Sequence, residues 1–152
     1  MEIDTRTRFA YHQAGHALVL LFREIPFREV ALPAELPDDV TSLPLEVNWD
    51  TEELKEQRRF DLAAAGLAAE IALSGKGGSS ADALVFGEFA HHVLEGIELV
   101  WNLNLANAKE YTRCLMRDNR ELLDAVAAGL QSKGKLSRCD LLELKSQFSG
   151  CH

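Results

Sequence analysis

Two histidines, His12 and His16, lie four residues apart in the segment AYHQAGHALV. On an α-helix, residues with this spacing stand one turn apart on the same face, so both imidazoles can bind one metal ion. Apolar residues recur here at helical spacing, and no proline interrupts residues 6–23. We therefore predict a helix over residues 6–23 that carries a candidate metal-binding pair.

Two residues between the histidines add to this prediction. In zinc peptidases with the pattern H-E-x-x-H the glutamate acts as general base, but here that position is Gln13. An amide cannot take up a proton at neutral pH, so the pattern predicts metal binding without efficient catalysis. Gly15 costs a helix about 1 kcal/mol relative to alanine, which indicates that another element packs closely at this turn.

The segment AYHQAGHALV resembles the zinc-binding helix of FtsH-type ATP-dependent metalloproteases, AYHEAGHALV, and differs from it only at Gln13. Two later segments resemble the same family in the same order: AGLAAEIALSG is similar to AGRAAEEL-G, and GSSADAL is similar to GASNDL. The resemblance implies that His12, His16 and Asp82 bind zinc and that Glu70 lies close to the metal. There the Glu70 carboxylate would accept the free imidazole N–H of a ligand histidine.

The resemblance covers the peptidase part of the family and neither its ATPase module nor its membrane anchor. It implies a single peptidase-like domain over residues 1–152, whose substrates would be peptides or unfolded proteins. Whether a separate ATPase subunit cooperates, and whether the glutamine is natural or introduced, stays open. The change Gln13→Glu alters the shape of the side chain little, and we expect it to raise cleavage by roughly 10²-fold.

Three classes of function are compatible with these residues. The first is a zinc metalloendopeptidase domain, impaired by Gln13. The second is a non-catalytic module that binds peptides or a protein partner on the same scaffold. The third is a helical domain in which His12 and His16 only pack, and metal content distinguishes it from the other two.

The rest of the chain predicts a mainly α fold, a compact bundle of about five or six helices. All four prolines fall within residues 25–44. Weak alternation at residues 28–32 and 45–47 predicts a small two-stranded β ribbon after the zinc-binding helix. In FtsH-type proteases a strand beside this helix offers its edge to the substrate backbone. Further helices are predicted over residues 50–74, 83–99, 105–117, 120–132 and 137–148.

Composition and net charge limit the number of domains, the possible partners and the cellular compartment that we expect for this chain. A chain of 152 residues is long enough for one domain with a proper core. Its net charge of −8 argues against nucleic acid or an anionic membrane as partner. The apolar run at residues 17–22 is too short to span a bilayer, and the polar N-terminus does not resemble a signal peptide. The scattered Cys114, Cys139 and Cys151 predict reduced thiols in a cytoplasmic protein, and a homo-oligomer stays open.

Overall fold

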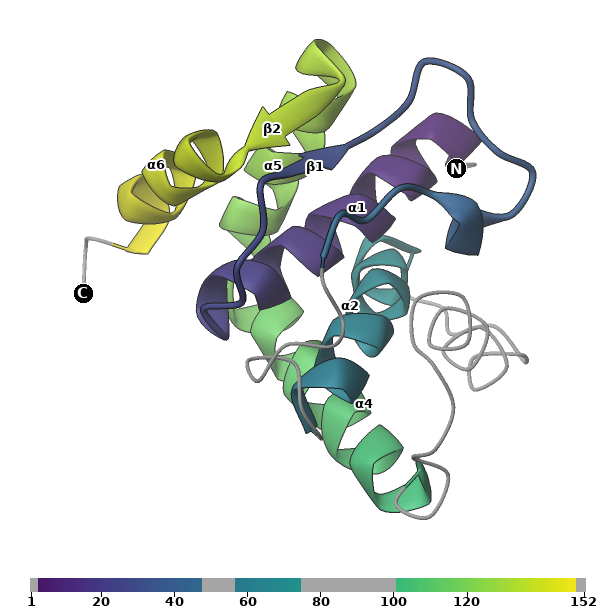
Figure 1. Cartoon of the computed structure of the whole chain (residues 1–152), viewed down its shortest axis with the longest axis vertical. Coiled ribbons are helices and arrows are strands. Elements are labelled where there is room, and N and C mark those ends of the chain that lie inside the picture. The colour runs from purple at the N-terminus through teal and green to yellow at the C-terminus, as the bar shows by residue number, and fades with distance from the viewer. Residues whose placement is uncertain (1–2, 48–56, 75–100, 150–152) are drawn as a thin grey trace.

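The computed structural model describes residues 3–47, 57–74 and 101–149. Its central element is helix α1, Thr5–Phe22, as predicted (Figure 1). The Asp4 side chain caps the helix by accepting a hydrogen bond of 2.7 Å from the backbone N–H of Thr7. The helix ends where Glu24 takes a left-handed backbone conformation with φ 54°. This end turns the chain back along α1.

Four further helices are described, and two of them pack directly along α1 (Figure 1). Helices α2 (Gln57–Ser74) and α5 (Arg120–Lys133) both pack against α1. Helix α4 (Trp101–Asp118) packs against α2. Helix α6 (Arg138–Ser149) follows and contacts α5. The fold is therefore mainly helical, as the sequence predicts.

The sheet has two strands, β1 (Glu29–Ala31) and β2 (Lys135–Ser137), which pair antiparallel with Val30 opposite Leu136. The sequence predicts that residues 28–32 pair with residues 45–47. This prediction is wrong, because the main partner of β1 is β2. Leu45 makes only one antiparallel bridge to Val30. The partner differs because the buried Leu136 side chain draws residues 135–137 onto the core beside β1.

Local signals predict the end of α5 and the start of α6 correctly. Gly134 ends α5 with φ 81°, a left-handed conformation that glycine adopts without strain. Ser137 and Asp140 cap α6 reciprocally, since each side chain accepts from the other residue's backbone N–H at 3.1 Å. The helix predicted over residues 83–99 and the N-cap predicted at Asp50 lie outside the described residues.

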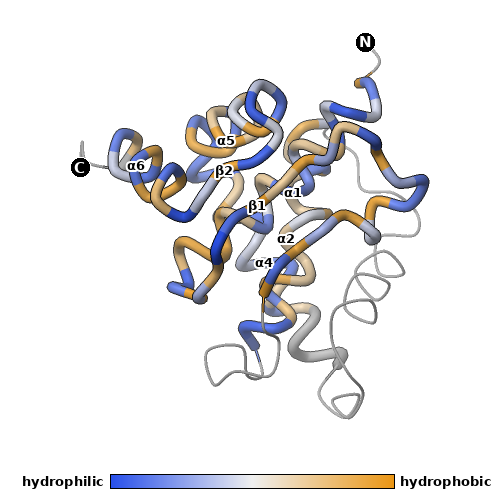
Figure 2. The backbone as a smooth tube through the Cα atoms, turned by 45° about the horizontal axis from the view of Figure 1, so that its top comes forward, coloured by the Kyte–Doolittle hydropathy of each residue, from blue (hydrophilic) through white to orange (hydrophobic). Residues whose placement is uncertain are grey.

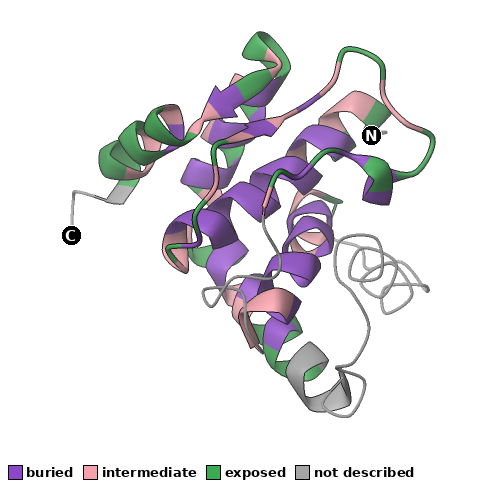
Figure 3. Ribbon diagram, in the orientation of Figure 1, coloured by how far each residue is buried: buried purple, intermediate pink, exposed green. Residues whose placement is uncertain are grey.

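The core follows α1, which is buried along most of its length (Figure 3). Its largest fully buried side chains include Phe9, Leu18 and Leu20 of α1 and Phe60 of α2. Only some residues of the loop that follows α1 are buried in this core. Figure 2 shows the backbone changing from hydrophilic at the start of β1 to hydrophobic beyond it. A 3-10 turn, η1 (Val40–Ser42), follows on this loop.

Within residues 3–47, 57–74 and 101–149, no helix combines the length and the apolar character needed to cross a membrane. Cys114 on α4 and Cys139 on α6 are free thiols, and Cys151 falls outside the described part of the chain.

Candidate functional site

His12 and His16 form a buried pair on the face of α1 that contacts α2. Each histidine is 1% exposed. Their Nε2 atoms lie 3.2 Å apart, and their rings meet edge to face at 78°. The one-turn spacing on α1 brings the rings together. Helix α2 supplies the groups that orient them.

The Nδ1 atom of each ring faces an acceptor on α2. His12 Nδ1 donates to Glu70 Oε2 at 2.7 Å, and His16 Nδ1 donates to the carbonyl oxygen of Leu62 at 2.8 Å. Carboxylate and carbonyl oxygens only accept, so the proton of each neutral ring lies on Nδ1. The lone pair of each neutral ring therefore lies on Nε2. The two histidines direct these lone pairs toward each other.

Two lone pairs at this separation repel unless a proton or a cation lies between them. A tetrahedral zinc ion with Zn–N distances of about 2.0–2.1 Å holds two ligand nitrogens about 3.3 Å apart. The observed separation of 3.2 Å between His12 Nε2 and His16 Nε2 agrees with this value. The pair therefore fits a tetrahedral divalent cation in spacing and in tautomer.

Two glycines allow α1 and α2 to approach this closely. A methyl group at Gly66 would lie 2.5 Å from His12 Nδ1. One at Gly15 would lie 2.7 Å from the Ala69 Cβ and would overlap the Ala65 backbone. The close approach that the sequence predicts at Gly15 is confirmed, and its partner is α2.

Glu70 bonds both to His12 and to Arg8, so it links the histidine pair to a positively charged side chain at the surface. Its carboxylate is 8% exposed, and its second oxygen accepts a hydrogen bond from Arg8 Nε. Burial raises the pKa of this carboxyl, but the hydrogen bonds from His12 and Arg8 together with the positive charge of Arg8 outweigh burial and lower it. The sequence prediction omitted Arg8, although it precedes His12 by four residues and so shares its face of α1.

The side-chain amide of Gln13 is bonded at β1 and at the segment that follows the loop. Its Nε2 donates to the carbonyl oxygens of Ala31 at 2.9 Å and Pro44 at 2.7 Å, and the residue is 1% exposed. The side-chain amide therefore joins α1 to two segments that lie 18 and 31 residues away. A carboxylate has no proton to donate, so a glutamate here would face two carbonyl oxygens without a hydrogen bond. The change Gln13→Glu is small in shape but large in hydrogen bonding.

The third predicted ligand, Asp82, lies outside the described residues. In the part of the chain that is described, no three His, Cys, Asp or Glu side chains are grouped to hold a metal ion. The described structure brings the Nε2 atoms of His12 and His16 together and places Glu70 at His12 Nδ1, away from that pair of atoms. The roles of these residues toward zinc stay predictions.

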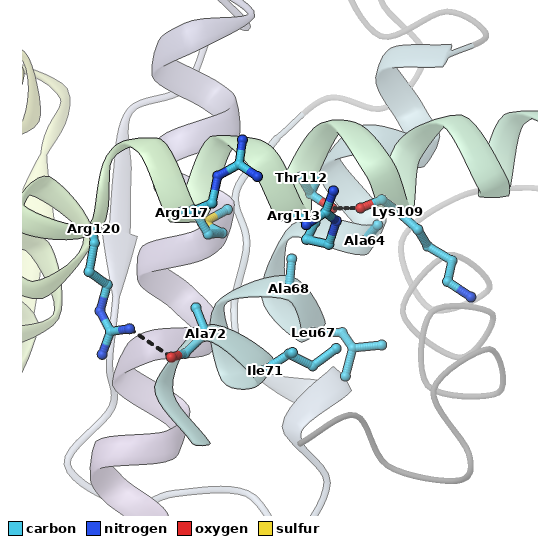
Figure 4. A pocket seen from close by; sticks show the side chains of 11 residues that line it. Ala64, Leu67, Ala68, Ile71, Ala72, Lys109, Thr112, Arg113, Arg117 and Arg120 are labelled. Atoms are coloured by element: carbon cyan, nitrogen blue, oxygen red, sulfur yellow. Dashed lines mark hydrogen bonds between the residues drawn. The ribbon is translucent and has the colours of Figure 1, made fainter. Parts of the chain in front are cut away.

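A separate groove lies on the other side of α2, between α2 and α4 (Figure 4). Its volume is about 490 Å³. We call it the α2–α4 groove. Its floor is apolar and its rim is basic. The floor includes Ala64, Leu67, Ala68, Ile71, Ala72 and Met116, and the rim includes Lys109, Arg113, Arg117 and Arg120.

No protein-family model matches this chain, and a search of curated proteins gives no significant match. The chemistry of the site therefore rests on its own residues.

Proposed function

We propose that this chain is a zinc-binding, peptidase-like domain similar to the peptidase part of FtsH-type metalloproteases, with impaired catalysis. The observation that carries the proposal is the geometry of His12 and His16. Their Nε2 atoms are 3.2 Å apart, and both Nδ1 atoms face acceptors. A metal ion bound by both Nε2 atoms would account for the spacing and for the tautomer together.

The two described candidate ligands are imidazoles, a ligand type that zinc commonly takes. His12 and His16 would hold the ion, with Asp82 as third ligand by resemblance. When bound, zinc would polarise a substrate carbonyl and lower the pKa of water. Glu70 fixes the ring of His12 and raises its basicity. Arg8 in turn holds the Glu70 carboxylate.

Catalysis is impaired because Gln13 has no basic oxygen. The amide hydrogens of Gln13 are both engaged with backbone carbonyls, which fixes the side chain toward β1. General acid–base catalysis contributes roughly 10²–10⁴-fold to rate, and its loss leaves a domain that binds rather than cleaves. The ligands we propose are peptides or unfolded chains, and the proposed setting is the cytoplasm.

Metal analysis of protein purified without a metal-binding tag tests the proposal. We expect about one zinc per chain. The double variant His12→Ala and His16→Ala should lose it. The matched control is His91→Ala with His92→Ala, which removes the same number of imidazoles from adjacent positions. A parent protein that is metal-free and gains no thermal stability from added zinc would contradict the proposal.

Cleavage of casein at equal zinc occupancy tests the catalytic part. We expect the parent to stay at background. Gln13→Glu should raise chelator-sensitive cleavage by roughly 10²-fold, because it restores the missing base. It should also lower stability, because its carboxylate would face the Ala31 and Pro44 carbonyls. A zinc-loaded variant that stays inert would favour the binding module over the peptidase.

The α2–α4 groove favours the alternative, a non-catalytic module that binds a peptide or protein. Its apolar floor suits the apolar face of an amphipathic segment. Binding of such a peptide that persists in the presence of a chelator would support this alternative. Binding that depends on zinc would place the ligand at the histidine pair.

A further inference from the structure

We infer that residues 43–47 occupy the strand edge that a peptide substrate would use, and that Gln13 holds them there. The proposal rests on the peptidase-like function for what it implies about substrates. Its physical content, a closed strand edge held by a buried amide, is independent of zinc.

Both edges of β1 have neighbours within the chain. β2 pairs along one edge, with Val30 opposite Leu136. Leu45 forms an antiparallel bridge to Val30 as well, so it lies on the other edge. Extended peptides bind proteins by adding a strand to such an edge. Here a segment of the same chain already has that position.

Gln13 is placed to hold this segment against β1. Its single amide nitrogen donates to Ala31 of β1 and to Pro44, the residue before the bridge. The two bonds join the strand and the segment through one side chain. Leu43 and Leu45 add apolar anchors, because they are 2% and 9% exposed. The segment is therefore held by hydrogen bonds and by burial together.

The same amide explains why glutamine suits this position. Both acceptors are carbonyl oxygens, which need a donor. Glutamate at position 13 would leave both carbonyls without that donor and would loosen the segment. In our proposal one residue thus removes the general base and closes the peptide edge.

Hydrogen exchange of backbone amides tests whether the segment is held as proposed. Leu45→Ala removes an anchor and leaves Gln13 intact, whereas Gln13→Met keeps the length of the side chain and removes its donors. In both variants we expect exchange at residues 43–47 to accelerate by roughly tenfold or more, while α5 keeps its protection. Leu45→Val and Gln13→Asn are milder versions for use if either variant fails to fold.

A peptide with the sequence of residues 42–47, SLPLEV, tests whether the vacated edge accepts an extended chain. An open fraction that grows by some factor raises apparent affinity by the same factor. Leu45→Ala should therefore bind this peptide more tightly than the parent, by the factor seen in exchange. Gln13→Met should gain less, because the amide that would hold the peptide's proline carbonyl is gone.

Leu136→Val is the matched control, since it trims a leucine on the opposite edge of β1. It should leave exchange at residues 43–47 unchanged. Unchanged exchange in folded Gln13→Met would overturn the role of Gln13. If Leu45→Ala loosens the segment but does not bind the peptide more tightly, the proposal that the segment occupies a peptide-binding edge is wrong. Both measurements are made with chelator present, so a protein that proves not to bind zinc would refute the proposed function and leave this inference intact.

Discussion

Both sides of α2 carry small residues, but only the side that faces α1 packs closely against its neighbouring helix. The side that faces α1 has Ala65 and Ala69 one turn apart with Gly66 between them, and a methyl group added at Gly66, or at Gly15 of α1, would overlap the opposite helix. The side that borders α4 has Ala64 and Ala68 at the same interval, and it leaves a groove of about 490 Å³. Small side chains alone therefore do not decide how closely two helices pack.

The partner of each side accounts for the difference. Toward α1 the space above Gly66 is filled by the His12 ring, and Gly15 lets the two backbones approach. Toward α4 the facing residues include long basic side chains, such as Arg113, that extend to solvent. The charged residues on the two sides of α2 also differ in how far they are buried. Glu70 is buried and bonded to the buried His12, whereas Arg113 pairs with Glu110 at the surface, where an ion pair adds little stability.

Gly66→Ala should give the largest loss of stability, because it disrupts the close packing between α1 and α2. The added methyl group would overlap the His12 ring and force α1 and α2 apart. Overpacking of a core costs about 1–3 kcal/mol, and we expect the upper end of that range here. Urea unfolding gives the free energy, and metal analysis should show loss of zinc.

Gly129→Ala on α5 is the control for this change. A methyl group there would lie 3.1 Å from a Leu136 methyl, whose flexible side chain can shift slightly. The gain in helix propensity, about 1 kcal/mol, offsets that contact. Equal loss of stability in both variants would mean that the space at Gly66 has no special role.

Glu70→Gln should give the next effect, on metal affinity. The amide oxygen still accepts a hydrogen bond from His12 Nδ1 but carries no negative charge to raise the basicity of the ring. We expect zinc affinity to fall by roughly 10–100-fold, as measured by competition with a chelator of known affinity. Glu110→Gln, which neutralises an exposed carboxylate, should leave zinc affinity unchanged. Unaltered affinity in Glu70→Gln would separate this carboxylate from the metal.

Asp61→Asn tests a second buried charge between α1 and α2. Burial raises the pKa of Asp61 more than Gln57 and Arg23 lower it. The folded state therefore binds the proton more tightly than the unfolded state, and the stability this provides is lost as pH rises through the raised pKa. The variant has no such loss, so its stability relative to the parent should increase over the range from the ordinary aspartate pKa of 3.8 upward. A constant difference across this range would contradict the raised pKa.

The histidine face of α1 could be predicted from sequence because its information is local. Spacing gives the His12 and His16 pair, and Gly15 signals a close neighbour. The identity of that neighbour is a long-range property. Glu70 entered the prediction only through a resemblance, although its position between apolar residues marked it as unusual.

The other face of α1 could not be predicted in the same way. The Gln13 amide bonds to two backbone carbonyls, and a carbonyl carries no signal in the sequence. Strand β2 was missed for a related reason. Its three residues, Lys135–Ser137, contain a single apolar side chain, and their extended form depends on pairing with β1.

Ala68→Leu should give the smallest effect, and it tests the open side of α2. Ala68 lies two residues from Gly66 and is half-buried on the floor of the α2–α4 groove. Leucine adds apolar surface that the groove can cover, and its helix propensity is close to that of alanine. We expect stability within about 0.5 kcal/mol of the parent and unchanged zinc content. If Ala68→Leu instead destabilises the protein as strongly as Gly66→Ala, the groove is filled in solution, and α2 packs closely on both sides.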